Sequence, residues 1–296
     1  MTPKMRAHPS LAALAALLLA TACAGKSKKA ETDTALDESI DDGTARRKGE
    51  SGVNVEYGAT AQDNWKLGEE ALADENYLAA QKYFQYIRAK FPYSGLATKA
   101  DLRVADCLFL RERWLEAIDA YSNFARLHPS HEDAGYAYFK VGESYAQQIP
   151  SDWFFLPPSS EKDQGPAKDA ARALQSYVDR YPKDKWHVDG VKRLTEVREK
   201  LVAHERAVAN FYNKIDKQRA RAGRLEIIRR DYADVGADDQ LLFELVEAWA
   251  AVPEKGRAES AFEELGRRFP QSPKTAEARE LLSAIPASTS TTTASR

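Results

Sequence analysis

The distribution of apolar residues predicts a chain of helical hairpins from about residue 64 onward. Apolar side chains recur at helical spacing over 64–73 and again over 77–90. Gly68 and Ala80 are small residues at which the two helix backbones can approach closely. Pro92 follows the second helix and ends it, because proline cannot donate the backbone hydrogen bond that a continuing helix needs. The pattern therefore predicts an antiparallel helix pair closed by proline.

The same order of small, apolar, aromatic and proline positions returns about one unit later. Ala105 and Ala117 take the two small positions of this second copy, and Pro129 closes it. A repeat of this order over about 34 residues is typical of tetratricopeptide hairpins, which must stack because one hairpin cannot bury its own apolar face. We therefore predict an all-α fold, an α-solenoid of about five tetratricopeptide (TPR)-like hairpins with a C-terminal capping helix.

The third unit is enlarged. In it 28 residues separate the small positions Gly142 and Ala170, against 12 between Gly68 and Ala80, so about 16 extra residues lie inside this hairpin. They include four consecutive apolar residues, Trp153–Leu156. Insertions in repeat proteins form loops, often on the binding face. We expect this segment either to fold back onto the array or to contact a partner.

The fourth unit departs most from the pattern, and the fifth restores it. A long first helix is expected over 188–212, Arg221 takes the usual small position, and Ala233 replaces the closing proline. A last helix over 275–285 is expected to cap the array. Basic residues also gather in the fourth unit, where they form either a solvated helix face or a surface for an acidic partner: Lys214, Lys217, Arg219, Arg221, Arg224, Arg229 and Arg230.

The N-terminus predicts export. Residues 1–22 combine the positive charges of Lys4 and Arg6 with the apolar run Leu11–Leu19, which is too short to span a bilayer. Small residues then lead into Cys23, an arrangement that resembles the lipobox of bacterial lipoproteins, although leucine lies one position further from the cysteine than usual. The alternative is ordinary signal cleavage beside a chance cysteine. Lipid attachment at Cys23 is the leading prediction, and several acyl chains would anchor the chain firmly.

Composition divides the chain into four parts. Lysine, aspartate, glutamate, serine, threonine and glycine dominate between residues 24 and 61, which therefore cannot bury enough apolar surface to fold. The Ser/Thr-rich C-terminal end is similarly polar. The predicted parts are a signal peptide (1–22), a lipidated cysteine with a flexible tether (23–61), the TPR-like array (62–286, with a groove half at 62–134 and a docking half at 135–286) and a disordered tail (287–296).

Charge and motifs give no indication of an enzyme. The 296 residues have a formal net charge of −2, so no nucleic-acid partner is expected. Only two cysteines occur, and Cys107 falls among helical packing positions, where we expect a small buried side chain. His128 and His131 lie in a proline-containing turn without the second histidine of a zinc protease motif. Because glycine-rich phosphate loops, nucleophile elbows and CxxC pairs are also missing from the sequence, we expect no catalytic residue, metal or cofactor.

Repeat geometry predicts where a ligand would bind. In stacked hairpins the first helices line one face, through positions three before, one after and four after the small residue. Acidic residues recur along these positions, as Glu69, Asp106 and Glu143. An extended peptide could insert aromatic side chains among the rings of this face. The alternative is that several rings pack against the next hairpin. The predicted substrate or peptide groove consists of Trp65, Lys99, Leu102, Phe109, Tyr136 and Phe139.

Three aromatic and proline-containing strings, together with Cys23 and the enlarged third unit, resemble the BamD family. This is the TPR lipoprotein family of the outer-membrane β-barrel assembly machinery, and the resemblance covers nearly the whole chain. The long tether, the degenerate fourth unit and the Ser/Thr tail depart from it. The strings are Tyr83-Phe84-x5-Lys90-Phe91-Pro92-Tyr93-Ser94, Ala117-Ile118-x-Ala120-Tyr121-x2-Phe124-x-Arg126-Leu127-His128-Pro129, and Ala170-x2-Ala173-Leu174-x2-Tyr177-x3-Tyr181-Pro182.

The resemblance implies a scaffold that helps to insert β-barrel proteins into the outer membrane. It implies a lipid-anchored, palmitate-bearing protein on the periplasmic face, whose C-terminal repeats dock on a BamA-like barrel subunit. Its N-terminal groove would receive unfolded outer-membrane proteins, whose C-terminal signals end in an aromatic residue. Two alternatives stay open. One is a periplasmic TPR coordinator of the Tol-Pal and cell-division type, against which the lack of heptads in residues 24–61 argues. The other is a lipoprotein helper of pilus or secretin assembly.

Overall fold

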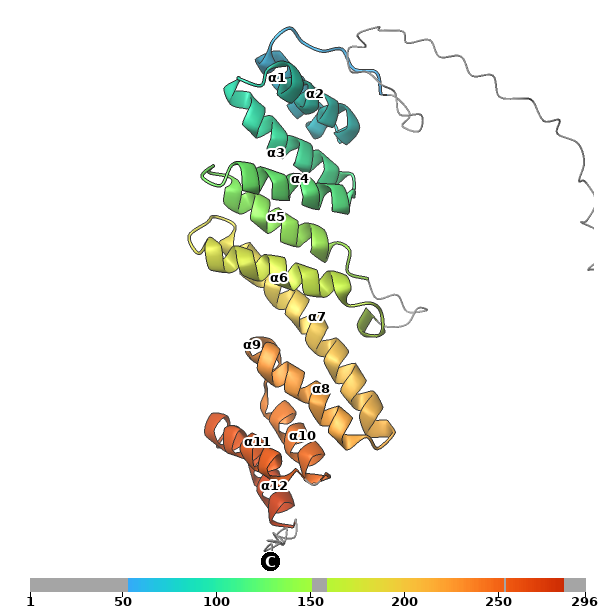
Figure 1. Ribbon diagram of the computed structural model, residues 1–296, viewed down its shortest axis with the longest axis vertical. Coiled ribbons are helices and arrows are strands. Elements are labelled where there is room, and N and C mark those ends of the chain that lie inside the picture. The colour runs from blue at the N-terminus through green and yellow to red at the C-terminus, as the bar shows by residue number, and fades with distance from the viewer. Residues whose placement is uncertain (1–52, 151–158, 253, 285–296) are drawn as a thin grey trace, which may run out of the picture. The chain divides into compact units, whose positions relative to one another are not determined.

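Antiparallel helices follow one another along the chain, as the periodicity predicted (Figure 1). The computed structural model describes residues 53–150, 159–252 and 254–284, and the regular structure of these residues is all helical. The predicted signal (1–22), Cys23, Trp153–Leu156 and the tail (287–296) lie outside the described residues. The first two hairpins are α1 (Ala61–Ala73) with α2 (Tyr77–Lys90), and α3 (Gly95–Leu110) with α4 (Trp114–Leu127).

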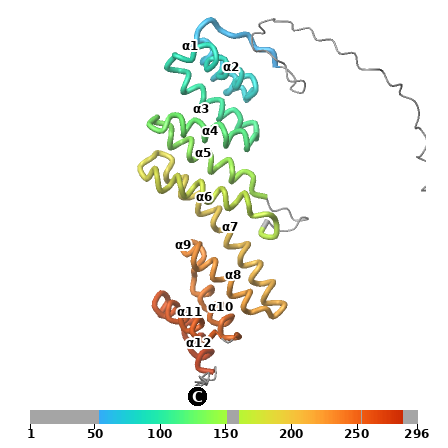
Figure 2. The backbone as a smooth tube through the Cα atoms, in the orientation of Figure 1, coloured from blue at the N-terminus to red at the C-terminus, as the bar shows by residue number. Residues whose placement is uncertain are grey.

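The later helices continue the same succession, which the backbone trace makes easy to follow (Figure 2). The all-α fold of stacked TPR-like hairpins with a capping helix is therefore confirmed. The remaining elements are α5 (Ala134–Ala146), the 3-10 helix η1 (Ser159–Glu161), α6 (Gly165–Arg180), α7 (His187–Lys214), α8 (Gln218–Asp231), α9 (Ala233–Gly236), α10 (Asp239–Ala250), α11 (Lys255–Arg268) and the capping helix α12 (Pro273–Ser283).

The turns inside three hairpins share one backbone conformation. Glu75 between α1 and α2, Glu112 between α3 and α4, and Asp216 between α7 and α8 have φ values of 58°, 58° and 53°. This left-handed region is uncommon for residues other than glycine. Its recurrence shows that α7 and α8 form the same kind of hairpin as the first two units, despite the degenerate sequence of the fourth unit.

The long helix α7 belongs to two hydrophobic cores. Its first half packs on α6, where Leu194, Val197 and Leu201 join the core of the third hairpin. Its second half contributes Val202 and Ala209 to the core of the C-terminal helices. A third core joins α1 to α5 and includes Cys107, whose side chain is fully buried and whose pKa is raised by burial to about 12. The expected role of Cys107 as a small buried side chain is confirmed.

Residues 53–60, which the sequence places in the tether, contact the first hairpin. The Lys82 Nζ donates to the Val53 carbonyl at 2.6 Å, and the Tyr57 ring stacks on Tyr86 with centroids 4.0 Å apart. Asn64 is fully buried, and its side-chain amide donates to the carbonyls of Gly58 and Thr60 at 2.8 and 2.7 Å. Ordered packing therefore begins before the expected boundary at residue 61, because one buried amide connects the extension to α1.

Replacing Asn64 with alanine should release this extension. The substitution removes the side-chain partner of the Gly58 carbonyl and of the Gly58 N–H, and one of the two partners of the Thr60 carbonyl. A lost buried hydrogen-bonding partner costs about 1–3 kcal/mol. We expect a lower denaturation midpoint and early protease cleavage within residues 53–63, mapped by mass spectrometry. The exposed Asn54→Ala is the matched control, and equal cleavage of both variants would contradict the assignment.

Candidate functional site

Charged residues of the first helices form a repeating pattern, which we call the first-helix strip. Arg103 on α3 lies between two acids: its Nε is 3.0 Å from Glu69 Oε1 on α1, and its Nη1 is 3.1 Å from Asp106 Oδ2 on α3. Arg193 on α7 repeats this arrangement, with its Nε 2.9 Å from Glu143 on α5. The strip is defined by Trp65, Glu69, Arg103, Asp106, Phe109, Tyr136, Lys140, Glu143, Trp186, Arg193 and Glu196.

Asp106 is the buried centre of the strip. Its Oδ1 accepts hydrogen bonds from the Tyr121 hydroxyl at 2.6 Å and from the Tyr136 hydroxyl at 3.0 Å, while Oδ2 pairs with Arg103. Burial, and next the negative charge of Asp106, raise the pKa of Tyr121 and Tyr136 above the ordinary tyrosine value. Three donors on one carboxylate fix the relative positions of α3, α4 and α5.

Lys140 breaks the pattern of ion pairs. It lies on α5 two residues before the small position Gly142, as Arg103 lies two residues before Ala105 on α3. Its ammonium nitrogen is 3.2 Å from the centroid of the Phe109 ring, which also contacts Trp114 edge-on at 5.1 Å. Burial lowers the pKa of Lys140 from its ordinary value. The strip thus contains a half-buried cation in contact with an aromatic ring.

The predicted groove residues divide into two groups. Trp65, Phe109 and Tyr136 are partly exposed on the strip, and Lys99 is exposed one helical turn before Arg103. Leu102 and Phe139 were expected to line the groove, but the structure buries both, at 7% and 8% exposure. Leu102 packs in the core formed by α1 to α5. The ring centroid of Phe139 lies 5.5 Å from that of Tyr177, and Phe139 stacks on Trp186 with ring centroids 6.1 Å apart. This correction arises because successive hairpins close over those two positions.

Five residues of the strip were not predicted as part of the groove: Arg103, Lys140, Trp186, Arg193 and Glu196. The register contained a signal for two of them, since Arg103 and Lys140 each lie two residues before a small position. Trp186 is the N-cap residue of α7, and Arg193 lies in the first half of this long helix. The small position of α7 is Ala209 in its second half, so the repeat pattern assigned no groove position to the first half. Trp186 contacts the strip through Tyr136, with ring centroids 5.7 Å apart.

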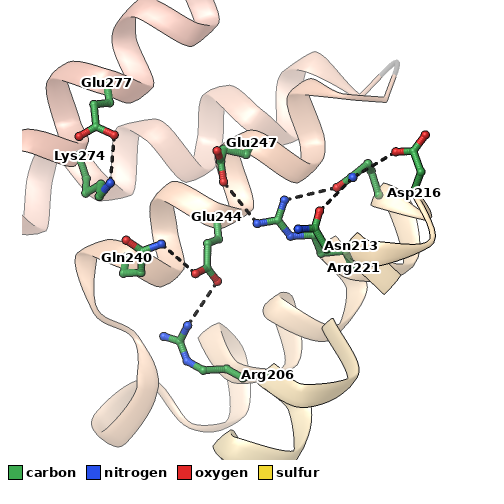
Figure 3. A network of polar contacts seen from close by, with 10 residues as sticks. Arg206, Asn213, Asp216, Arg221, Gln240, Glu244, Glu247, Lys274 and Glu277 are labelled. Carbon is green, nitrogen blue, oxygen red and sulfur yellow. Dashed lines mark hydrogen bonds and ion pairs between the residues drawn. The ribbon is translucent and has the colours of Figure 1, made fainter. Parts of the chain in front are cut away.

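In the C-terminal half, charged residues of α7, α8 and α10 form a network of polar contacts (Figure 3). Arg206 lies three residues before the small Ala209 on α7, and its Nη1 is 3.3 Å from Glu244 on α10. Arg221 on α8 is 3.3 Å from Glu247 on α10. Arg221 takes the usual small position in the sequence pattern, and its side chain pairs with Glu247 of α10. Charge pairing therefore helps to hold α7, α8 and α10 together.

The arginines of the basic stretch in the fourth unit are paired with acids of the array itself, an arrangement that differs from both the solvated face and the surface for an acidic partner that the sequence suggested. Arg224 pairs with the buried Glu205 at 3.1 Å, and Arg229 pairs with Glu226 and Glu264 at 2.8 and 2.9 Å. Further pairs join Arg219 to Glu254, Arg221 to Glu247 and Arg230 to Asp231.

Comparison with known proteins assigns the chain to a family. The model of the outer membrane lipoprotein family YfiO matches residues 58–261, so the chain belongs to this family. It is similar to the outer membrane protein assembly factor BamD of Caulobacter vibrioides, with 25% identity over 87% of this chain and 75% of the relative. The proteins of the same name from Neisseria meningitidis serogroup B and Rickettsia prowazekii are 26% and 25% identical over 74% and 68% of this chain, and 85% and 77% of theirs.

The chain also has a weak likeness to solved TPR structures. A solved structure of the TPR2AB-domain:pHSP90 complex of yeast Sti1 resembles this chain with 11% identity and a TM-score of 0.37, over 74% of this chain and 83% of that one. Among the helices that the structure describes, none combines the length and apolar character needed to cross a bilayer.

Proposed function

We propose that this protein is a non-enzymatic assembly factor for β-barrel proteins of the outer membrane. The observation that carries the proposal is the family match over residues 58–261, which includes all of the first-helix strip. The named relatives are outer membrane protein assembly factors, and stacked TPR-like hairpins are scaffolds for binding other proteins. In this proposal the protein is lipid-anchored through Cys23 on the periplasmic face of the outer membrane.

The two halves of the array take different partners in this proposal. The strip on α1, α3, α5 and α7 binds unfolded segments of outer-membrane proteins. Its partly exposed aromatic rings offer apolar contact, and its ordered charges orient the segment. The C-terminal helices dock on a BamA-like barrel subunit. The ion pairs among α7, α8 and α10 support this role, because they make that half a preformed surface rather than one that must fold on binding.

Recovery of partners from outer membranes tests the proposed function. The full chain, solubilised in mild detergent and isolated through a tag, should co-purify with a barrel-assembly subunit. Recovery of Pal or TolA instead would support the Tol-Pal coordinator, and recovery of a secretin would support the pilus or secretin helper. Either result would overturn the proposal.

Phe109→Ser should weaken binding of an unfolded, aromatic-containing outer-membrane segment by about tenfold. The substitution removes one exposed ring contact, and a truncated aromatic anchor typically costs more than about 1 kcal/mol. Binding would be measured by fluorescence anisotropy, and circular dichroism would verify the fold. Leu115→Ser is the matched control, since Leu115 is 68% exposed on α4 and outside the strip. An unchanged affinity in a folded Phe109→Ser protein would argue against the strip as the peptide site.

A further inference from the structure

A cluster of aromatic rings lies at the N-terminal end of the array, on α2 and outside the first-helix strip. The Tyr57 ring stacks on Tyr86 with centroids 4.0 Å apart and meets Tyr83 edge-on at 6.0 Å. Tyr86 in turn contacts Phe91 edge-on at 6.0 Å. Tyr57 is 45% exposed and the other three rings are partly exposed. We call these four rings, together with the exposed Lys90, the aromatic patch.

The aromatic patch is amphipathic rather than purely apolar. Tyr83, Tyr86 and Lys90 follow one another at spacings of three and four residues, so they share one face of α2. The surrounding sequence is basic, because residues 77–100 contain no acid, and the cations of this stretch are Lys82, Arg88, Lys90 and Lys99. The extension adds one acid, Glu56, beside Tyr57. Positive charge can therefore supplement the aromatic contact but does not dominate it.

The extension joins the array to the rest of the chain beside this patch. The Val53 carbonyl is held on α2 by the Lys82 ammonium, which donates to it at 2.6 Å. Residues 24–52 separate Val53 from Cys23, and a chain of that length spans at most about 100 Å when fully extended. The aromatic patch is thus the part of the array that lies nearest along the chain to the proposed lipid anchor.

We propose that the aromatic patch is a membrane-contact surface, through which the N-terminal end of the array rests on the headgroups of anionic phospholipids. The inference rests on the proposed lipid anchor at Cys23. Tyrosine suits such a surface because its ring is apolar while its hydroxyl stays in contact with water, and tyrosine is enriched at membrane interfaces. A lysine near the surface adds about fivefold in affinity through its attraction to negative headgroups.

The anchor makes even a weak contact effective. A surface tethered to its target has an effective local concentration in the millimolar range, so the patch needs little intrinsic affinity for lipid. A protein held both at Cys23 and at the patch rotates less freely than one held at Cys23 alone. The contact would therefore limit the orientations in which the first-helix strip faces the periplasm.

A fluorescent probe on the extension tests this contact in the full, acylated chain reconstituted in vesicles. The probe is attached at Asn54→Cys, an exposed position, because Cys107 is fully buried. The vesicles are phosphatidylcholine with about one-third phosphatidylglycerol and a lipid spin-labelled at the headgroup, which quenches a probe near the surface. We expect quenching at position 54. The matched position Gln271→Cys, exposed between α11 and α12, should stay unquenched.

Substitutions in the patch should release the N-terminal end from the vesicle. Lys90→Glu should lower the ratio of quenched to unquenched chains about tenfold or more, because it replaces an attraction with a repulsion. Lys168→Glu, at an exposed lysine of α6, is the matched control and should leave the ratio unchanged. Tyr57→Ser should lower the ratio about fivefold by removing the most exposed ring, with circular dichroism to verify the fold.

The outcomes separate the membrane contact from the anchor and from the assembly function. Mass spectrometry of the N-terminal peptide detects acyl chains on Cys23. Their absence would overturn the anchor and this inference, but it would leave recovery of a barrel-assembly subunit unaffected. In an acylated chain, equal quenching at positions 54 and 271, or quenching at neither, would overturn the membrane contact alone. Protection of the position-54 probe by a co-purified protein instead of lipid would assign the patch to a protein partner and also overturn the proposal.

Discussion

Gly142→Val should destabilise the array by about 3 kcal/mol or more, a large part of the stability of a typical domain. A Cβ atom at position 142 would lie 2.6 Å from two side-chain carbons of Leu174 and 3.2 Å from the Leu174 backbone nitrogen. The side chain alone cannot yield enough space, because the α6 backbone is also in contact. Helices α5 and α6 would have to separate, and the core that they share with α7 would open.

The measurement is the free energy of unfolding in urea, with circular dichroism and tryptophan fluorescence compared to detect stepwise unfolding of the repeats. Gly223→Ala is the matched control. Gly223 lies in α8, and a Cβ there meets nothing within 4 Å, so the higher helix propensity of alanine should stabilise the protein by up to about 1 kcal/mol. If Gly142→Val were as mild as Gly223→Ala, close approach of α5 and α6 would not be the reason for glycine at position 142.

Asp106→Ala should cost about 3–5 kcal/mol, because it leaves two tyrosine hydroxyls without their acceptor and removes one of the two carboxylates paired with Arg103. The loss should appear as a lower denaturation midpoint and weaker packing among α3, α4 and α5. Asp101→Ala is a suitable control on the same helix as Asp106. Asp101 forms a more exposed ion pair with Arg88 of α2, so its loss should cost at most about 1 kcal/mol.

We expect the protein to lose stability at alkaline pH because of the hydrogen bonds from Tyr121 and Tyr136 to Asp106. Tyr121 and Tyr136 have a pKa raised in the folded state, so the folded protein holds their protons after the unfolded chain has released them. The two tyrosines contribute fully to the free energy of unfolding at pH values below their pKa in the unfolded chain, about 10. Above that pH the contribution falls by up to about 1.4 kcal/mol per pH unit for each tyrosine. Tyr121→Phe should make the decline shallower, as followed by urea midpoints between pH 8 and 11. An equal slope in both proteins would contradict this cause.

The candidate site was predicted less completely than the fold, for a physical reason. Small, aromatic and proline positions report contacts inside one hairpin, and these contacts recur in each unit. Exposure on the strip depends on how the next hairpin covers the first helix. The sequence placed Trp65, Phe109 and Tyr136 on this face, and the structure leaves all three partly exposed. It could not show that Phe139 would be covered by Trp186.

By itself, the sequence determined the helical hairpins, their turns at regular spacing and the close contact of α5 with α6 at Gly142, since each depends on residues near in the chain. It also contained the recurring acidic positions Glu69, Asp106 and Glu143. Only the tertiary structure decided that α7 links two cores and brings Arg193 to Glu143. Only it decided that Lys140 lies on Phe109 rather than between two acids, because that choice depends on the packing of α3 against α5.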